Sequence, residues 1–389
     1  MRAMHQNLRI PGPTPLPDEV RQAQAAPMID HRGTEFGEML REISSGIAAL
    51  VGTGNEVLLL TASGTGAMEA AIVNCLSPGD RVLAVSIGSF GDRFAQIAER
   101  YGTAIDRLEV EWGEAADPEQ LAATLAGREP YRAVLLTHNE TSTGVANPLR
   151  ELVAAVHDAP GDPLVIVDGI SGLGAMPFET DAWGIDLVVS ASQKAWMASP
   201  GIAIAIVGER ARAAEGSARM PRYYFDFAEA RRWAEKGQTP WTPAVAVLFG
   251  LRVGVQRLGA EGRDATWARH VAVAAGAQAG LRTLGLRLLA PEAHRSPTVT
   301  AAWLPDGLEW APFNAEMRRR GLVVAGGQGQ MTGRILRFGH MGMVEADELA
   351  AAVRVMGDVM RDIGYEVDPA GAADATLRSA GAASAAASR

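Results

Sequence analysis

Short apolar segments alternate with amphipathic ones through the middle of this chain, from about residue 57 to residue 207. Runs rich in Val, Ile and Leu are typical of strands buried on both faces, and strands that alternate with helices predict a mostly parallel sheet covered by helices. The predicted strands are Val57–Leu60, Arg81–Val85, Ile105–Val110, Ala133–Thr137, Leu164–Val167, Leu187–Ser190 and Ile202–Val207. The predicted helices include Gly66–Cys75, Gly91–Arg100, Pro118–Leu125 and Leu149–His157.

The last predicted strand follows its predecessor closely. Only residues 195–201 separate Lys194 from Ile202, whereas a parallel crossover needs a dozen residues or more. We therefore expect this strand to pair antiparallel. The fold class is α/β, with a mostly parallel seven-stranded sheet in a large domain.

The length of 389 residues exceeds what one core usually supports, so we expect a second, smaller domain of α+β type. Its predicted elements are the helices Asp264–Leu284, Phe313–Arg320 and Glu345–Ile363 and the strands Val299–Trp303 and Arg334–Phe338. We assign residues 17–255 to the large domain and residues 1–16 plus 256–368 to the small one. Residues 369–389 are almost entirely Ala, Gly and Ser, and we expect a disordered tail.

The composition excludes several classes of partner. A formal net charge of −9 argues against nucleic acid and anionic membranes. No apolar stretch reaches the ~20 residues of a membrane span, and no secretory signal is seen, so we expect a cytoplasmic protein. The single cysteine, Cys75, excludes an intrachain disulfide and a cysteine-built metal site, and no metal site is predicted.

Lysine is nearly absent from the sequence. Lys194 and Lys236 are the only two, and arginine supplies the other 34 of the 36 basic side chains. Arginine does not readily lose its proton, so it cannot serve as the amine that forms a Schiff base. Lys194 follows a predicted buried strand, at the sheet edge where α/β proteins bind ligands. Lys194 is therefore a candidate catalyst, whereas Lys236 is expected to be a surface charge.

Two further loops have suitable chemistry. Asp168 ends a predicted strand 26 residues before Lys194, where a carboxylate can hold a pyridine nitrogen protonated or simply begin a turn. Ser63, Gly64 and Thr65 lie between a strand and a helix, so their N–H groups and hydroxyls can bind a phosphate. The alternative is a tight strand–helix turn. The segment matches neither the Walker nor the dinucleotide pattern.

Other polar or aromatic residues follow the same strands. Phe90 can stack on a planar ring or pack in the core, and Thr141 can contact a cofactor or cap a helix. Gln193, beside Lys194, can donate to a phosphate. Arg337 can bind a carboxylate through two parallel hydrogen bonds, with a surface position as the alternative. Arg334 is less favoured because strand alternation places it on the opposite face.

The order of these motifs resembles a known family. Ser-Gly-Thr, Gly-Ser-Phe-Gly-Asp-Arg, His-Asn-Glu-Thr-Ser-Thr-Gly, Val-Asp-Gly-Ile-Ser, Ser-Gln-Lys-Ala and Arg-Phe-Gly-His-Met-Gly follow one another along the chain. This series resembles the class V aminotransferases of pyridoxal phosphate (PLP) fold type I, most of all the alanine/serine–glyoxylate (or pyruvate) branch. The resemblance covers roughly residues 7–365 and includes Ile10-Pro-Gly-Pro-Thr-Pro.

The resemblance implies a role for each residue. Lys194 would form the Schiff base with PLP and shuttle the proton, Asp168 would contact the pyridine nitrogen, and Phe90 would stack on the ring. Arg337 and Gly12 would bind the substrate. The remaining implied cofactor contacts are Ser63, Gly64, Thr65 and Gln193 at the phosphate, Thr141 near the ring, and Thr242 or Gln238 of the partner subunit in a homodimer with shared active sites. Thr242 is favoured over Gln238. Phe90 and Thr65 depart from the tryptophan and histidine of eukaryotic members.

The predicted reaction is a ping-pong transfer of an amino group from a small L-amino acid, alanine or serine, to glyoxylate or pyruvate. It requires a pKa for Lys194 well below the usual value of about 10.4. Another class V PLP enzyme is the alternative, such as a phosphoserine, phosphonate or broader amine aminotransferase. A non-catalytic assembly protein on the same fold is less favoured. A cysteine desulfurase is disfavoured because Cys75 falls in a predicted helix.

Overall fold

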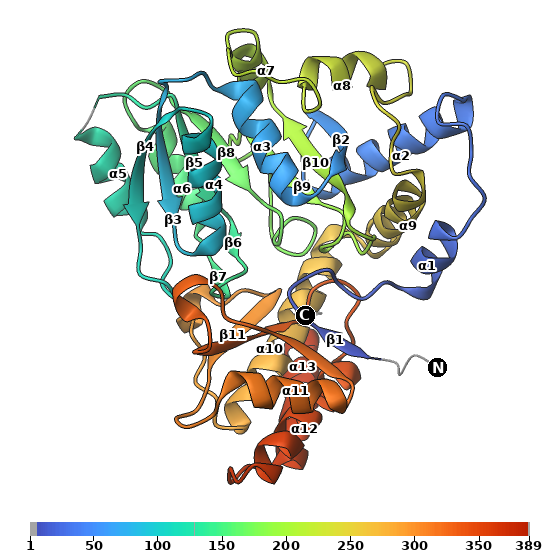
Figure 1. Ribbon diagram of the computed structural model, residues 1–389, viewed down its shortest axis with the longest axis vertical. Helices are drawn as coiled ribbons and strands as arrows, with labels where there is room; N and C mark the ends of the chain where they lie inside the picture. Colours follow the sequence, from blue (N-terminus) through green and yellow to red (C-terminus); the bar gives the residue numbers. More distant parts are fainter. Residues whose placement is uncertain (1–5, 128, 388–389) are drawn as a thin grey trace.

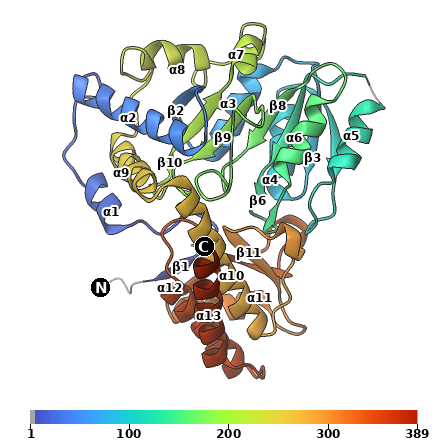
Figure 2. The same ribbon diagram turned by 180° about the vertical axis from the view of Figure 1, so that it is seen from behind.

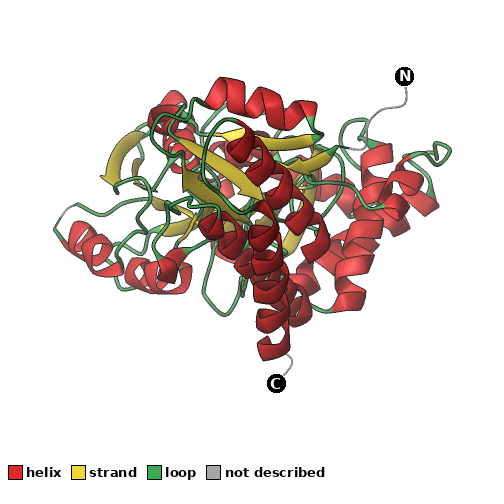
Figure 3. Cartoon of the chain, turned by 90° about the horizontal axis from the view of Figure 1, so that it is seen from below, coloured by secondary structure: helices red, strands yellow, loops and turns green. Residues whose placement is uncertain are grey.

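The structure is a computed structural model that describes residues 6–127 and 129–387. A large part is built on a seven-stranded sheet, and a smaller part on a four-stranded sheet lies below it in Figure 1. Seen from below, helices surround the strands of both parts (Figure 3). Within the described residues, no helix is both long and apolar enough to cross a membrane.

The seven-stranded sheet has the order β2-β10-β9-β8-β5-β3-β4. Its strands are β2 (Glu56–Ala62), β3 (Arg81–Ser86), β4 (Ala104–Glu109), β5 (Ala133–Thr137), β8 (Leu164–Asp168), β9 (Leu187–Ala191) and β10 (Gly201–Val207). Strand β10 pairs antiparallel with both β9 and β2, and the other neighbours pair parallel. The mostly parallel sheet and the antiparallel strand were both predicted correctly.

Helices cover both faces of this sheet. They are α2 (Thr34–Leu50), α3 (Gly64–Cys75), α4 (Ser89–Arg100), α5 (Pro118–Ala126), α6 (Leu149–His157), α7 (Glu209–Glu215), α8 (Phe227–Ala234) and α9 (Val245–Glu261). One core cluster joins the strands to α2, α5, α6 and α9, and a second joins them to α3, α4, α7 and α8. Along β5, Val134 and Leu136 belong to the first cluster, and Ala133 and Leu135 to the second. This alternation is what burial on two faces requires.

The smaller sheet has the order β1-β12-β13-β11. Its elements are β1 (Asn7–Arg9), β11 (Val299–Trp303), β12 (Leu322–Gly326), β13 (Ile335–Gly339), α10 (Arg263–Thr283), α11 (Trp310–Arg319) and α12 (Ala346–Asp362). Strands β1 and β12 were not predicted, and they pair with each other in parallel. The N-terminal segment therefore begins in the small sheet, and α1 (Asp18–Gln24) follows it against α9.

The expected disordered tail is wrong. Residues Pro369–Ala387 form a helix, α13, that packs against α10 and α12 (Figure 2). Small residues allow this close approach: a Cβ on Gly280 of α10 would lie 2.2 Å from Thr376 Oγ1, and Ala372 and Ala380 are buried. Alanine also has the highest intrinsic helix propensity. The small side chains of α13 bury little area by themselves, but they allow the helix to pack closely against the glycines of α10.

Candidate active site

The loops after β3, β5, β8 and β9 lie at the carboxyl edge of the parallel strands, where such sheets bind ligands. At this edge Phe90 lies in the first turn of α4 after β3, and Thr141 lies in the loop between the short strands that follow β5. Asp168 is the last residue of β8, and Lys194 lies in the loop after β9. Arg337 comes from β13 of the smaller sheet, and its charge and that of Asp168 both act on the Lys194 amine. Residues far apart in the sequence thus converge between the two sheets.

Lys194 is buried under the N-terminal segment. Its Nζ donates a hydrogen bond to the Pro11 carbonyl at 3.0 Å. Thr14 fastens the same segment to the lysine loop, because its N–H donates to the Gln193 carbonyl at 3.1 Å and its Oγ1 donates to the Lys194 carbonyl at 3.2 Å. A Cβ on Gly12 would lie 2.7 Å from Nζ, so only glycine leaves room for the amine.

Burial lowers the pKa of Lys194 from 10.5 to about 8. The negative charge of Asp168 opposes this shift, and the positive charges of Arg337 and Arg93 add to it. Because desolvation disfavours the charged form of an amine, an appreciable fraction of Lys194 is neutral near physiological pH. The predicted reaction requires a lowered pKa for Lys194, and burial is the largest cause of the shift.

Asp168 is buried at the end of β8, where its Oδ1 accepts a hydrogen bond from the Ile170 N–H at 2.8 Å. Burial raises its pKa from 3.8 to about 7. The nearby charge of Glu140 adds to this increase, whereas the Ile170 hydrogen bond and the charges of Lys194 and Arg93 oppose it. A buried carboxyl of this kind lacks a full countercharge and would be stabilised by a cationic ring nitrogen.

The turn between β2 and α3 presents unused hydrogen-bond donors. Ser63 is the N-cap of α3, and its Oγ accepts from the Gly66 N–H at 3.4 Å. The N–H groups of Gly64 and Thr65 lie in the first turn and have no intrahelical acceptor. Within the described residues no hydrogen bond is found for the side chain of Gln193, whose Oε1 is buried. The N–H groups of Gly64 and Thr65 are suited to a bound anion.

Arg93 connects two residues of the predicted cofactor site. Its guanidinium carbon lies 4.7 Å from the centroid of the Phe90 ring, and its Nη1 donates to Thr65 Oγ1 at 3.3 Å. Arg93 ends the Gly-Ser-Phe-Gly-Asp-Arg motif, and no role was predicted for it. The i,i+3 spacing from Phe90 was the available signal, because it places both side chains on one face of a helix.

Arg337 is buried, and hydrogen bonds fix its orientation. Nε donates to the Gly326 carbonyl at 2.8 Å, while Nη1 donates at 3.3 Å to both Gln328 Oε1 and the Thr141 carbonyl. Burial lowers the pKa of Arg337 to about 10, and Glu140 opposes the shift. Thr141 is held in turn by a 2.8 Å hydrogen bond from its Oγ1 to Ser171 Oγ.

Two basic residues singled out in the sequence lie elsewhere. Arg334 precedes β13 and stacks on Trp303 at 5.1 Å, which agrees with its predicted separation from Arg337. Lys236 is exposed, as predicted, with its Nζ 5.1 Å from the centroid of the Trp233 ring.

The two residues predicted to act on the partner's cofactor lie between α8 and α9. Gln238 exchanges hydrogen bonds with Arg32, at 3.1 Å from its Nε2 to the Arg32 carbonyl and at 3.1 Å from Arg32 Nη1 to its Oε1. Thr242 is exposed. No hydrogen bond among the described residues joins either of them to Lys194, and their action across a dimer stays a prediction.

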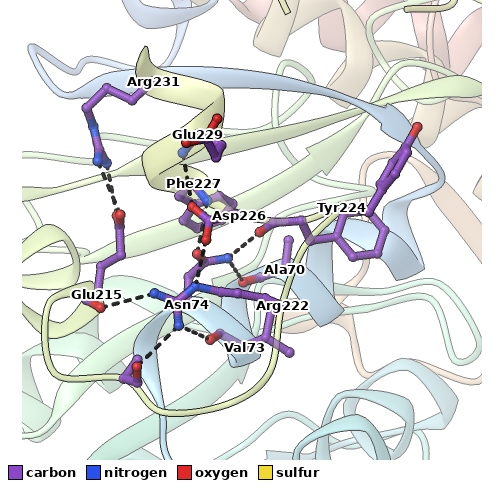
Figure 4. A network of polar contacts seen from close by, with 12 residues as sticks. Ala70, Val73, Asn74, Glu215, Arg222, Tyr224, Asp226, Phe227, Glu229 and Arg231 are labelled. Atoms are coloured by element: carbon purple, nitrogen blue, oxygen red, sulfur yellow. Dashed lines mark hydrogen bonds and ion pairs between the residues drawn. The ribbon is translucent and has the colours of Figure 1, made fainter. Parts of the chain in front are cut away.

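The segment before α8 is fixed to α3 by buried polar contacts (Figure 4). Asn74 Nδ2 donates to the Phe225 carbonyl at 2.6 Å, and Asn74 Oδ1 accepts from the Phe227 N–H at 3.0 Å. Arg222 Nη1 donates to the Val73 carbonyl at 3.1 Å. The exposed Tyr223 ring, 4.8 Å from the centroid of Trp241, is thereby held near Thr242 in a defined position.

Comparisons with known proteins agree with this geometry. The family model "Aminotransferase class-V" matches residues 17–345. A "Soluble hydrogenase, small subunit" from Synechococcus sp. (strain PCC 6716) is 40% identical over 361 residues, which cover 92% of this chain and 94% of the relative. An L-aspartate–glyoxylate aminotransferase from Paracoccus denitrificans is 34% identical over 364 residues, covering 92% of each. The solved ureidoglycine–glyoxylate aminotransferase of Bacillus subtilis matches with a TM-score of 0.91 at 26% identity, covering 97% of this chain and 99% of that one.

The family model spans most of the chain, and the solved structural neighbours have PLP fold type I, as predicted. The chain therefore belongs to the class V aminotransferase family, a transaminase whose cofactor is pyridoxal 5'-phosphate.

Proposed function

We propose that this enzyme transfers the amino group of a small L-amino acid, alanine or serine, to glyoxylate or pyruvate in a ping-pong sequence. The observation that carries the proposal is the buried Lys194 amine, which has a pKa of about 8 and lies within reach of the charges of Asp168 and Arg337. Glyoxylate recurs in the names of two reported relatives whose amino donors differ. The acceptor is therefore better supported than the donor.

When bound, PLP supplies an aldehyde that condenses with amines and a ring that accepts the electron pair of a broken Cα–H bond. Lys194 is proposed as the group that bonds the cofactor and, once released, moves the Cα proton. A general base works best when its pKa lies near the working pH, and burial brings the pKa of Lys194 toward that range. The Pro11 carbonyl, 3.0 Å away, would orient the free amine.

Asp168 is proposed to hold the cofactor's pyridine nitrogen. A protonated nitrogen there would supply the positive charge that the buried carboxyl lacks, and would return its pKa toward the usual value. Ser63, Gly64, Thr65 and Gln193 are proposed to bind the phosphate. Their support is the first turn of α3, whose N–H groups have no intrahelical acceptor. Phe90 and Thr141 are proposed to contact the ring.

Arg337 is proposed to bind the substrate carboxylate, with Gly12 lining the same space. The described residues hold Nε and Nη1 of Arg337 and provide no hydrogen bond to Nη2, which leaves that nitrogen for a ligand. No carboxylate among the described residues forms an ion pair with Arg337. A buried guanidinium without a counterion favours binding of an anionic substrate.

We also propose a homodimer in which Thr242, with Gln238 as the less favoured donor, reaches the partner's phosphate. The support is the exposed Tyr223 ring, which lies against the half-buried Trp241 ring next to Thr242 on a segment that is fastened to α3. Large exposed aromatic rings of this kind are typical of protein interfaces.

The hydrogenase name of one relative does not carry over to this chain. An iron–sulfur cluster takes several cysteine thiolates, and the sequence has one cysteine. That residue, Cys75, is buried in α3, and burial raises the pKa of its thiol to about 12, so it is not a thiolate ligand.

The test is a panel of amino donors, namely alanine, serine, aspartate and phosphoserine, each against glyoxylate and pyruvate. The half-reaction is followed by the loss of the visible absorption of the PLP enzyme when a donor is added without an acceptor. We expect alanine or serine to be turned over with glyoxylate, and Lys194→Ala to abolish both colour and turnover. A wild-type protein that binds no PLP, or a coloured one that turns over no donor on the panel, would refute the proposal.

A further inference from the structure

We infer that Glu140 is a positioning residue that joins the cofactor side of the active site to the substrate side. The inference rests on the proposed function. It concerns a residue to which neither the sequence motifs nor the proposed function assign a role. Glu140 is fully buried in β6 (Asn139–Glu140), a short strand that pairs with β7 (Val145–Ala146). The loop between these strands carries Thr141.

Four hydrogen bonds converge on the Glu140 carboxylate. Oε2 accepts from the N–H groups of Phe90 at 3.0 Å and Gly91 at 3.1 Å. Oε1 accepts from the Ser142 N–H at 2.9 Å and from Ser142 Oγ at 2.6 Å. Ser142 Oγ in turn accepts from the Ser89 N–H at 3.0 Å. The carboxylate thus ties the first turn of α4 to its own loop.

The ionised form of Glu140 fits these contacts. Burial raises its pKa and the hydrogen bonds oppose that shift, but both oxygens accept from donors and neither needs a proton of its own. The N-terminus of α4 adds the positive end of a helix dipole, which favours an anion. The chain itself therefore fills the anion position of α4, whereas the equivalent position of α3 stays open for a phosphate.

The backbone before α4 packs tightly against the Glu140 side chain. The backbone of Gly88 crosses directly over the carboxylate, and a Cβ there would lie 2.6 Å from Glu140 Cγ and 2.5 Å from Ser142 Oγ. Phe90, the proposed ring-stacking residue, is two residues further along. The position of its ring is therefore set by a side chain 50 residues away in the sequence.

The same loop reaches the substrate side. The carbonyl of Thr141, next to Glu140, accepts from Arg337 Nη1 at 3.3 Å, and the negative charge of Glu140 acts on the Arg337 guanidinium. Disturbing Glu140 should therefore move two things together, the ring contact of Phe90 and the carboxylate-binding geometry of Arg337. Removing Arg337 alone should disturb only the second.

The test compares Glu140→Gln with Asp186→Asn. Asp186 is also buried, and its Oδ2 accepts from the Val165 N–H at 2.7 Å and Arg210 Nη1 at 3.1 Å, but it lies at the amino ends of β8 and β9, away from the site. The measurements are the PLP dissociation constant by titration, the visible circular dichroism of bound PLP, and kcat and KM for the donor. Thermal unfolding without PLP reports the structural cost of each variant.

In Glu140→Gln, an amide NH2 replaces one carboxylate oxygen and cannot accept the two hydrogen bonds that this oxygen receives. We expect the PLP dissociation constant to rise about tenfold or more, which corresponds to ~1.4 kcal/mol. The dichroism of the bound cofactor should change and the donor KM should rise, while Asp186→Asn loses only thermal stability. Unchanged PLP affinity and dichroism in Glu140→Gln would overturn the inference, and an equal change in Asp186→Asn would do the same.

Ser142→Ala covers the case in which Glu140→Gln does not fold. It keeps the carboxylate and removes the hydroxyl that bridges Oε1 to the Ser89 N–H. The same changes in PLP affinity and dichroism are expected at smaller amplitude, and their absence would contradict the inference. A wild-type protein that takes up no PLP would refute the proposed function instead, so the two failures are distinguishable.

Discussion

Gly12→Ala tests whether the N-terminal segment sets the position of the Lys194 amine. Gly12 has φ of +142°, and an added Cβ would lie 2.7 Å from Lys194 Nζ and 3.0 Å from both Cδ and Cε. Two effects follow. The backbone is strained, by about 1–3 kcal/mol for an L-residue in such a region. The lysine side chain must also retreat, because no real Cβ approaches its neighbours so closely.

The two effects appear in different measurements. Backbone strain lowers the free energy of unfolding wherever it occurs. Displacement of the amine lowers reactivity, and a misplacement of about 1 Å can cost about 100-fold in rate. We therefore expect the rate of colour formation, after PLP is added to the cofactor-free protein, to fall by about two orders of magnitude. This step needs no amino acid, so it separates lysine displacement from any loss of substrate contacts at Gly12.

Gly364→Ala is the matched control. Gly364 has φ of +100°, and no heavy atom lies within 4 Å of its hypothetical Cβ. The control shares the backbone strain but not the contact, so it should lose stability and keep the rate of colour formation. If Gly12→Ala reacts with PLP as fast as Gly364→Ala, then the contact with Lys194 does not position the amine and the reasoning fails.

Three further outcomes are expected. Arg337→Ala should lower kcat/KM for the donor by about 100-fold, since hydrogen bonds to charged groups contribute ~1.5–3 kcal/mol each, and should keep the PLP colour; unchanged kcat/KM would exclude carboxylate binding. Asp168→Asn should stabilise the cofactor-free protein by up to about 4 kcal/mol above pH 7, because the buried carboxyl, with its raised pKa of about 7, must ionise there. The gain should vanish as the pH falls to the unfolded-state pKa near 4. A difference in urea unfolding that does not depend on pH would contradict this expectation. Gly280→Ala should destabilise the protein by its clash with Thr376 of α13, whereas Gly259→Ala, in α9 with open space around it, should stabilise by about 1 kcal/mol; equal effects in thermal unfolding would mean that α13 does not pack as described.

The large sheet was predictable because its signal is local. Each strand is a short apolar run between helical segments, and the antiparallel pairing of β10 follows from the shortness of its connection. Strands β1 and β12 were missed for the opposite reason. β1 has only three residues, which is too short for a recognisable strand. β12 is as long as several predicted strands, but it follows α11 after only two residues and lacks the spacing of a separate element. Their identity as strands comes from pairing with each other across the whole chain.

The helix α13 was missed because composition was taken to mean a lack of core. A chain of Ala, Gly and Ser buries little apolar area by itself, which is typical of disorder. The composition of this segment gives no information about the surface of α10 on which the helix packs. Gly276 and Gly280 of α10 lie under α13, and a Cβ on either would meet Thr376. Small residues on both helices permit a close contact that neither sequence segment reveals alone.

In the candidate active site, too, features that depend on neighbouring residues were predictable, and features that depend on contacts distant in the sequence were not. The turns that begin α3 and α4 look alike in the sequence, since each carries small residues between a buried strand and a helix. The structure separates them through Glu140, which reaches α4 from another loop and occupies its anion position, while the Gly64 and Thr65 N–H groups of α3 have no intrahelical acceptor. Motif order predicts which residues touch the cofactor. The contact of Arg93 with Phe90 could be expected from their i,i+3 spacing, but the contacts of Glu140 with Phe90 and Gly91 join two loops across the fold, and no spacing along the chain indicates them.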